Sequence, residues 1–252
     1  MSLEYEGDAV VQCPKCAGEA PLIARFCPHC GARLYHQEIS PAKAFLVVFM
    51  AYIIVIFGLP ILYLANVPLT FPVLSVIGEV IILLCPLVYM LHKRINVSEY
   101  IMVGRLKHLA LGLGLGIALQ GVSITLSLLL MYLIGPSAVV EEAEQMIINM
   151  ARESPILTML SLLLTGICEE FAFRGFLQNA ITRRYSLPAG IVVASIAFGL
   201  AHLDPQATYI IVAFAGGLLL GYFYSKFRSY VMAATAHATF NLITFAMLFL
   251  AG

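Results

Sequence analysis

The chain has 252 residues, of which 61% are hydrophobic and 11% are charged, and its formal net charge at pH 7 is zero. A soluble domain of this length can bury a sizeable core, but it cannot hide this much apolar surface from water. The balanced charge argues against a nucleic-acid partner, which would require a basic surface. The composition therefore predicts an all-α polytopic membrane protein that carries a small polar head.

Residues 1–40 differ in composition from everything that follows them. They contain two C-x-x-C pairs, Cys13 with Cys16 and Cys27 with Cys30. Two such pairs can close a tetrahedral four-thiolate shell around zinc, and the Pro and Gly residues beside them permit the tight turns that each pair requires. About 40 residues cannot build a sufficient core, so a structural zinc would supply the missing folding energy.

Other interpretations of these cysteines remain open at this stage. The pairs could form two disulfides in an exported head, or a redox pair. The module looks like a zinc ribbon, which either recruits a cytosolic partner or only folds the N-terminus. We expect His29 not to be a ligand, and we expect Cys85 and Cys168 to be small core residues of apolar helices. Met1–Gln12 contains three acidic residues and no apolar stretch, so we expect no cleavable signal peptide.

The rest of the chain consists of apolar segments separated by short polar connections. Each segment is near the roughly 20 residues needed to cross the hydrocarbon core of a bilayer. The stretch Val139–Arg152 is too polar to cross it, so we expect an interfacial helix or a loop there. We predict seven transmembrane helices, at about residues 44–65, 72–91, 109–134, 155–178, 188–204, 207–225 and 231–250.

The connections between these segments differ in charge. If the N-terminus lies inside, the inner connections carry eight Lys or Arg residues and the outer connections carry only Arg152. By the positive-inside rule, this places the cysteine head in the cytoplasm and the C-terminus outside. The cytoplasm is reducing, which favours zinc over disulfides. The inner residues are Lys93, Arg94, Arg105, Lys107, Arg183, Arg184, Lys226 and Arg228.

Glu169, Glu170 and Arg174 put two carboxylates and a guanidinium into a stretch otherwise built of Leu, Ile, Phe and Ala. Charges in such a segment usually face the interior of a helix bundle or a wet cavity. Glu170 and Arg174 are four residues apart and can pair, whereas Glu169 is rotated about 100° from them and can act on something else. The alternative is a structural ion pair with one spare Glu facing a lumen. We expect Glu79, a lone carboxylate in the second span, not to be catalytic.

Two later segments carry further polar groups in apolar settings. Phe198 and His202 end the fifth segment, and His237 and Asn241 lie four residues apart on one face of the seventh. A lone buried His is more often a hydrogen-bonded core residue than a catalyst. Together with the paired glutamates, however, these groups supply a general base, imidazoles that bind a metal or donate protons, and an amide that stabilises an oxyanion.

The order E-E-x-x-x-R, F-x-x-x-H and H-x-x-x-N on successive hydrophobic segments resembles the CAAX prenyl protease type II family, also called the CPBP or Abi family of intramembrane proteases. The resemblance covers roughly residues 150–250. It implies a peptidase whose site is sunk in a conical cavity within a helical bundle. We therefore assign residues 41–150 to N-terminal transmembrane helices with an interfacial segment, and residues 151–252 to a catalytic core. Prokaryotic members of the family are varied, so prenylation of the substrate is not implied.

The resemblance implies roles for the residues of the first two motifs. Glu169 would activate water, and Glu170 with Arg174 would orient Glu169 or hold its helix in place. His202 would share the water, or a metal, with Glu169. Phe198 would shape the cavity wall.

The third motif, H-x-x-x-N, supplies groups that could stabilise the tetrahedral intermediate, and its His could instead bind a metal. By resemblance, His237 and Asn241 would hold the carbonyl oxygen. A catalytic zinc held by Glu169, His202 and His237 is one alternative, because one Glu and two His suit zinc with an open position. Their spacing is not the H-E-x-x-H of soluble metalloendopeptidases, and a metal-free mechanism remains open.

The depths of these side chains in the bilayer do not agree if every segment is a straight span. At 1.5 Å per residue, the depth of His202 differs from those of Glu169 and His237 by about 12 Å. Either the helices tilt, or the fifth segment stops part way. We favour the second explanation, with His202 in a buried turn before Asp204 and Pro205.

Three functions follow from these patterns. The first is an intramembrane endopeptidase of a prokaryotic cell membrane that cuts a peptide or a membrane-anchored protein. The second is a non-catalytic membrane adaptor whose zinc ribbon recruits a partner. The third, a transporter with Glu169 and His202 as a proton relay, lacks the inverted repeat that many transporters show. The pattern of polar residues favours the peptidase.

Overall fold

The computed structural model divides into two compact units, Met1–Ile39 and Ser40–Gly252, which we call the head and the membrane core. Residues 1–9, where we expect no signal peptide, lie outside the described residues. The structure describes residues 10–13, 15–21, 24, 26–32, 39–65 and 67–251.

The head is built on a two-stranded antiparallel sheet. Strand β1 (Val10–Gln12) pairs with strand β2 (Glu19–Pro21). Ala20 is fully buried, and it packs with Cys13 and Cys27 into a small apolar cluster. So small a cluster contributes little to the free energy of folding, and the head therefore needs another source of stability.

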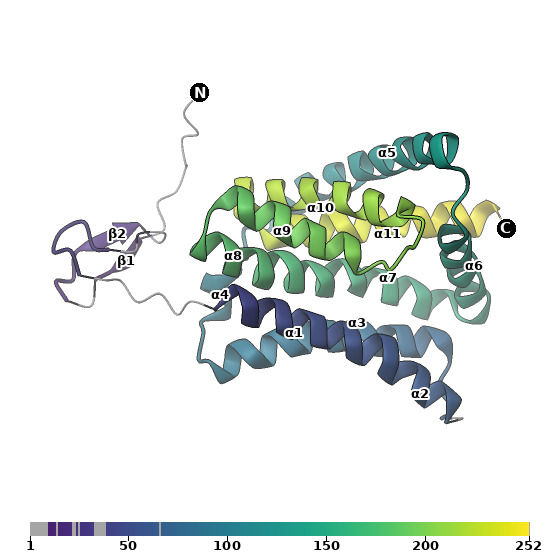
Figure 1. The fold of residues 1–252 in the computed structure, drawn as a ribbon, viewed down its shortest axis with the longest axis horizontal. Coiled ribbons are helices and arrows are strands. Elements are labelled where there is room, and N and C mark those ends of the chain that lie inside the picture. The colour runs from purple at the N-terminus through teal and green to yellow at the C-terminus, as the bar shows by residue number, and fades with distance from the viewer. Residues whose placement is uncertain are drawn as a thin grey trace. The chain divides into compact units, whose positions relative to one another are not determined.

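Every regular element of the membrane core is helical within the residues that the structure describes, as Figure 1 shows. Two stretches, η1 and η2, are π-helical and continue neighbouring α-helices. In chain order the elements are α1 (Pro41–Ile53), η1 (Ile54–Gly58), α2 (Leu59–Leu64), α3 (Phe71–His92), α4 (Val97–Tyr100), α5 (His108–Ile134), α6 (Ala138–Glu153), α7 (Pro155–Glu170), η2 (Phe171–Gln178), α8 (Asn179–Arg184), α9 (Leu187–Leu200), α10 (Thr208–Phe227) and α11 (Tyr230–Ala251).

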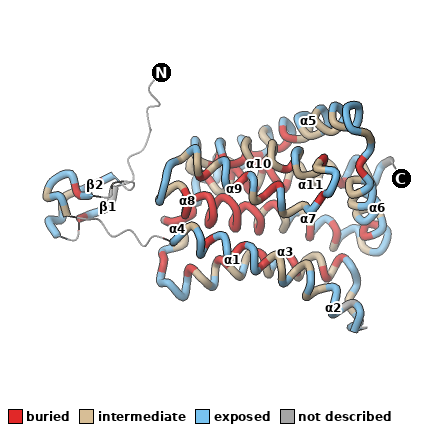
Figure 2. The backbone as a smooth tube through the Cα atoms, viewed as in Figure 1, coloured by how far each residue is buried: buried red, intermediate tan, exposed pale blue. Residues whose placement is uncertain are grey.

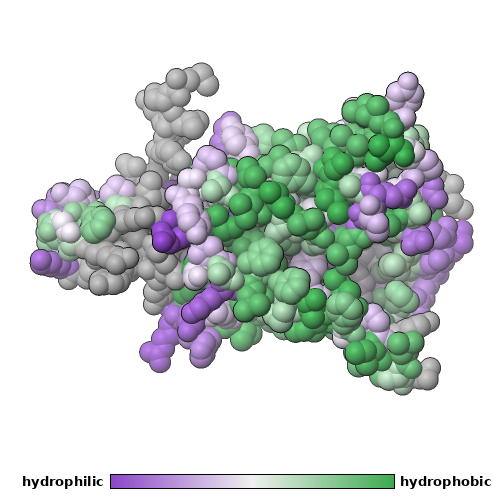
Figure 3. Space-filling model, in the orientation of Figure 1, coloured by the Kyte–Doolittle hydropathy of each residue, from purple (hydrophilic) through white to green (hydrophobic). Residues whose placement is uncertain are grey.

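Six helical segments within the described residues are long and apolar enough to cross a membrane. The predicted all-α polytopic membrane protein is thus confirmed. Hydrophobic residues cover the flank of the membrane core, and hydrophilic residues gather at its ends (Figure 3). The fifth helix is shorter than the apolar segment 188–204, because α9 ends at Leu200 and has only 14 residues, and it thus stops part way as the depth argument favours. The six spans are Pro41–Leu62, Phe71–His92, His108–Ile134, Pro155–Arg184, Thr208–Phe227 and Tyr230–Leu250.

Of the two alternatives for the polar stretch Val139–Arg152, the structure shows a helix. The side chain of Ser137 accepts a hydrogen bond from the backbone N–H of Val140 and caps the start of α6. Glu141 lies in the first turn and Arg152 in the last, and each has the sign that the helix dipole favours.

The connections between spans gather at two ends of the membrane core. At one end, the backbone N–H of Tyr230 donates to the carbonyl of Met102, and the guanidinium of Arg183 lies 4.4 Å from the centre of the Tyr100 ring. At the other end, the side chain of Gln206 bonds to the start of α6. The basic connections thus share one end, as the charge pattern requires, and the cytoplasmic side of that end remains a prediction.

Helix α11 packs against both α5 and α7, and glycines permit these contacts. On α5, a side chain at Gly116 would collide with the carbonyl oxygen of Ala236. On α7, any Cβ at Gly166 would collide with the backbone nitrogen of Ala238. The span Pro155–Arg184, which contains α7, is the most deeply buried of the six (Figure 2). The close crossing at Gly166 brings the end of α7 against the middle of α11.

Candidate functional site

The four cysteines of the head form one compact cluster. The Sγ atoms of Cys13 and Cys30 are 3.6 Å apart, as are those of Cys16 and Cys27, and all four lie within 4.8 Å of one another. Tetrahedral zinc with Zn–S bonds of about 2.3 Å separates its sulfurs by about 3.8 Å. The cluster therefore fits a metal ion such as zinc, and the cysteines are free thiols rather than the disulfides of the alternative interpretation.

Matching turns shape the two halves of this cluster. The backbone N–H of Cys13 donates to the carbonyl of Gly18, and that of Cys27 donates to the carbonyl of Ala32. Gly31 has a φ of +65°, a conformation that suits glycine. His29 lies beside this cluster, and its Nε2 lies 3.0 Å from the carbonyl of Glu19, which can only accept a hydrogen bond.

The thiols of the cluster differ in acidity. Burial raises the pKa of Cys13, but backbone N–H groups of Lys15 and Cys16 and neighbouring thiols outweigh burial and lower that pKa to about 6. A metal binds the thiolate form, so these N–H groups favour the ligand state at Cys13.

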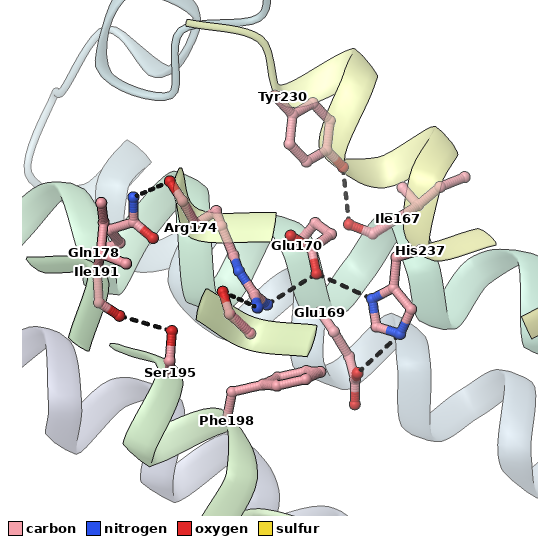
Figure 4. A network of polar contacts seen from close by, with 12 residues as sticks. Ile167, Glu169, Glu170, Arg174, Gln178, Ile191, Ser195, Phe198, Tyr230 and His237 are labelled. Atoms are coloured by element: carbon pink, nitrogen blue, oxygen red, sulfur yellow. Dashed lines mark hydrogen bonds and ion pairs between the residues drawn. The ribbon is translucent and has the colours of Figure 1, made fainter. Parts of the chain in front are cut away.

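In the membrane core, Glu170 and Arg174 form the predicted ion pair. Nη1 of Arg174 lies 2.8 Å from Oε1 of Glu170, and both side chains are almost completely buried (Figure 4). Nη2 of Arg174 donates to the carbonyl of Gly217 on α10. The pair is therefore enclosed by protein and joined through Oε1 of Glu170, whereas Oε2 of Glu170 is buried without a hydrogen-bond partner.

Glu170 also holds His237. Nδ1 of His237 lies 2.9 Å from Oε1 of Glu170, and Nε2 lies 3.9 Å from Oε2 of Glu169 (Figure 4). Because the carboxylate accepts, Nδ1–H donates to Glu170, and this orients the ring with Nε2 towards Glu169. From the motifs, Glu170 with Arg174 is predicted to orient Glu169 or to hold its helix in place, and this role stays a prediction. The hydrogen bond between Glu170 and His237 was not predicted.

One cavity of about 550 Å³ lies among α5, α6, α7, α10 and α11. Glu169, His202, His237 and Asn241 all line it, together with Phe198. The predicted residues thus fall into two groups: those that line the cavity, and the Glu170–Arg174 pair, which is buried beside it.

His202 lies in the turn after α9, as the depth argument expects, and Asp204 in the same turn is buried. Nδ1 of His202 lies 2.9 Å from the carbonyl of Phe198, so Nδ1–H donates and Nε2 is the nitrogen with a lone pair in the neutral ring. The Phe198 ring packs edge-on against both His202 and His237, with centroids 5.1 and 5.7 Å apart. Phe198 therefore contacts both imidazoles and forms part of the cavity wall.

Asn241 is fixed by a hydrogen bond across the α7–α11 contact. Its Nδ2 donates to the carbonyl of Leu162 at 3.1 Å. The amide has two N–H groups, so one remains for a group bound in the cavity.

Three motifs on three helices thus converge on a single cavity inside a membrane core. Residues 151–243 match the family described as type II CAAX prenyl endopeptidase Rce1-like. This confirms the family resemblance predicted from the motifs. The Rce1-like residues make up less than half of the chain, and no match was found among curated proteins or among solved structures. The Rce1-like match supports a CAAX-protease-like peptidase of the membrane.

The alternative of a catalytic zinc does not fit the Rce1-like site as the structure places its residues. Among the described residues, the head cysteines form the one group of three or more His, Cys, Asp or Glu side chains close enough to hold a metal. Glu169, His202 and His237 do not meet that requirement, so we derive no step through a metal at the cavity.

Sequence reasoning missed two residues at the Rce1-like site. The hydroxyl of Tyr52 on α1 donates to Oε1 of Glu169 at 2.7 Å, and the hydroxyl of Thr165 on α7 donates to Oε1 of Glu79 on α3 at 2.8 Å. Tyr and Thr are ordinary residues in apolar helices, so no local pattern marks either of them.

Proposed function

We propose that the protein is an intramembrane endopeptidase that hydrolyses a peptide bond of a membrane-anchored substrate with a water activated by Glu169. The observation that carries this proposal is the convergence of Glu169, His202, His237 and Asn241 on one cavity. The Rce1-like match supports the same reaction class.

Glu169 acts as the general base in this proposal. Tyr52 occupies its Oε1, which leaves Oε2, on the side of His237, for a water molecule. The lone pair at Nε2 of His202 orients that water. As the water oxygen bonds to the carbonyl carbon, its proton passes to Glu169, and the C–N bond then breaks as Glu169 returns the proton to the leaving amine.

His237 and Asn241 stabilise the oxyanion of the tetrahedral intermediate. With Nδ1–H bonded to Glu170, Nε2 of His237 faces the oxyanion, and Asn241 donates its second amide N–H to it. The Glu170–Arg174 pair is a positioning element, because it keeps His237 in this orientation without lining the cavity.

The walls of the cavity indicate a hydrophobic substrate segment. Apolar side chains of α5 and α6, among them Val122, Leu126 and Ile147, line the cavity together with Glu169. Such walls suit a peptide that belongs to a membrane-embedded protein. We propose a prokaryotic cell membrane as the location of this protein, because a zinc-ribbon head outside the matched residues suggests a bacterial or archaeal variant. The charge pattern supports a cytoplasmic head.

The test is a cleavage assay in liposomes. The full-length protein is incubated with a panel of single-span reporter peptides in ¹⁸O-labelled water, and the products are mapped by mass spectrometry. The proposal predicts cleavage near the membrane-embedded end of at least one reporter, with one ¹⁸O in the new carboxylate. Cleavage without ¹⁸O incorporation would reject hydrolysis by water.

A second candidate, a membrane adaptor, is favoured by one observation, the metal-type cysteine cluster in a unit of its own. The adaptor predicts that Cys13→Ser destroys the function while Glu169→Gln is silent. The peptidase predicts that Glu169→Gln abolishes the function.

A further inference from the structure

Glu169, the base of the proposed reaction, accepts a hydrogen bond from a residue that lies outside the Rce1-like match. Tyr52 lies on α1, nearly a hundred residues before the matched region, yet its hydroxyl is 2.7 Å from Oε1 of Glu169. We propose that Tyr52 is a positioning residue that holds the Glu169 carboxylate for attack, so that α1 and α3 complete the site. This inference rests on the proposed function.

Three side chains on one face of α7, each one turn from the next, take hydrogen-bond partners from α1 and α3. The repeated spacing of four residues places them in a row along the helix. Both helices are therefore fastened to the face of α7 that carries the base. The pairs are Ser161 with Ser75 (2.5 Å), Thr165 with Glu79 (2.8 Å) and Glu169 with Tyr52 (2.7 Å).

The ring of Tyr52 is itself held by aromatic packing. Its centroid lies 5.8 Å from that of Phe173 on η2, and Phe173 lies edge-on to Phe198 at 5.1 Å. Phe198 in turn contacts both histidines of the cavity. A tyrosine has few rotatable bonds, so this packing fixes the position of its hydroxyl.

The hydrogen bond from Tyr52 gives the two carboxylate oxygens of Glu169 different roles. Oε1 is anchored by Tyr52, whereas Oε2 lies on the side of His237. Without the hydroxyl, a carboxylate that is almost buried loses a donor and can rotate towards other partners. The loss should therefore lower the rate of the chemical step more than it weakens substrate binding.

The first experiment compares Tyr52→Phe with a matched control, Tyr89→Phe, in the liposome cleavage assay. The ring of Tyr89 on α3 packs edge-on against Phe176 of η2 at the same centroid distance of 5.8 Å. We expect Tyr52→Phe to lower kcat by about tenfold with KM within about twofold, because the bond acts on the base and not on the substrate. Tyr89→Phe should leave both constants unchanged. Equal losses in the two variants, or a change in KM alone, would overturn the inference.

The second experiment does not depend on activity. Dicyclohexylcarbodiimide modifies carboxyl groups in apolar surroundings, and mass spectrometry of peptides locates the product. We expect Tyr52→Phe to speed the modification of Glu169 by about threefold or more, since the anchoring donor is gone, and Tyr89→Phe to leave it unchanged. If Glu169 is labelled faster in Tyr52→Phe but the unchanged protein cleaves no reporter, the positioning role of Tyr52 is supported and the peptidase is rejected. Unchanged labelling together with unchanged kcat would reject the role of Tyr52 and leave the peptidase intact.

Discussion

At the scale of single residues, Glu170 is the acceptor on which the site depends. Its Oε1 takes hydrogen bonds from Arg174, four residues away, and from His237, 67 residues away. Helical spacing predicts the first bond, because positions i and i+4 share a face. No property of the sequence predicts the second, since it requires knowing how α7 and α11 pack. The ion pair of Glu170 with Arg174 was therefore predictable from the sequence, and its hydrogen bond with His237 was not.

The buried Glu170–Arg174 pair leads to a prediction about stability. Arg174→Ala leaves the Glu170 carboxylate buried without its cation, which should lower the free energy of unfolding by about 3–5 kcal/mol. Arg152→Ala, on the exposed side of α6, is the control and should change it by about 0.5 kcal/mol or less. Denaturant unfolding in detergent micelles measures both. Equal stabilities for the two variants would show that the ion pair does not hold the core together.

At the scale of helices, two elements depart from a simple pattern of straight α-helical spans: α9 in its length and η2 in its helix type. Helix α9 stops at Leu200, and this places His202 at the depth of the cavity. The buried π-helix η2 directly follows Glu170. Apolar content alone cannot reveal either feature. Hydropathy shows that a segment is buried in lipid or protein, but it shows neither where its helix ends nor which type of helix it forms. The short α9 was foreseen only from the conflict in depth. The π-helix was not foreseen.

The crossing of α7 and α11 is tested by adding one methyl group. Gly166→Ala puts a Cβ into the backbone of Ala238, so α11 must shift and carry His237 away from Glu169. We expect cleavage to fall by about a hundredfold, because small displacements of catalytic groups have effects of this size. Gly114→Ala is the control, since no described atom lies within 4 Å of a Cβ there, and it should keep full activity. An active Gly166→Ala variant would show that the close crossing does not position the site.

At the scale of the whole molecule, the head and the membrane core are separate units with separate chemistry. The cysteine cluster of the head was predictable, because the two C-x-x-C pairs can meet around a metal. The membrane core was predictable as a set of spans and motifs. The contribution of α1 and α3 to its site was not, since their contacts with α7 join residues more than 80 positions apart.

We expect the cysteine cluster of the head to hold the metal of this protein. The purified full-length protein should contain about one equivalent of zinc, and a Cys13→Ser/Cys27→Ser double variant should contain none. Cys85→Ser is the control and should retain the metal, because Cys85 is not part of the cluster. Elemental analysis measures all three. Zinc retained by the double variant would place an ion elsewhere and contradict this assignment.

The central claim is that Glu169 activates the water that cuts the peptide bond. Its most direct test is the turnover number of Glu169→Gln beside that of Glu142→Gln, an exposed change on α6 outside the cavity lining. We predict that Glu169→Gln lowers kcat by at least about a hundredfold in a protein of normal stability, since an amide cannot accept the proton. Glu142→Gln should have no effect. A Glu169→Gln variant that cleaves the reporter as fast as Glu142→Gln would contradict the account.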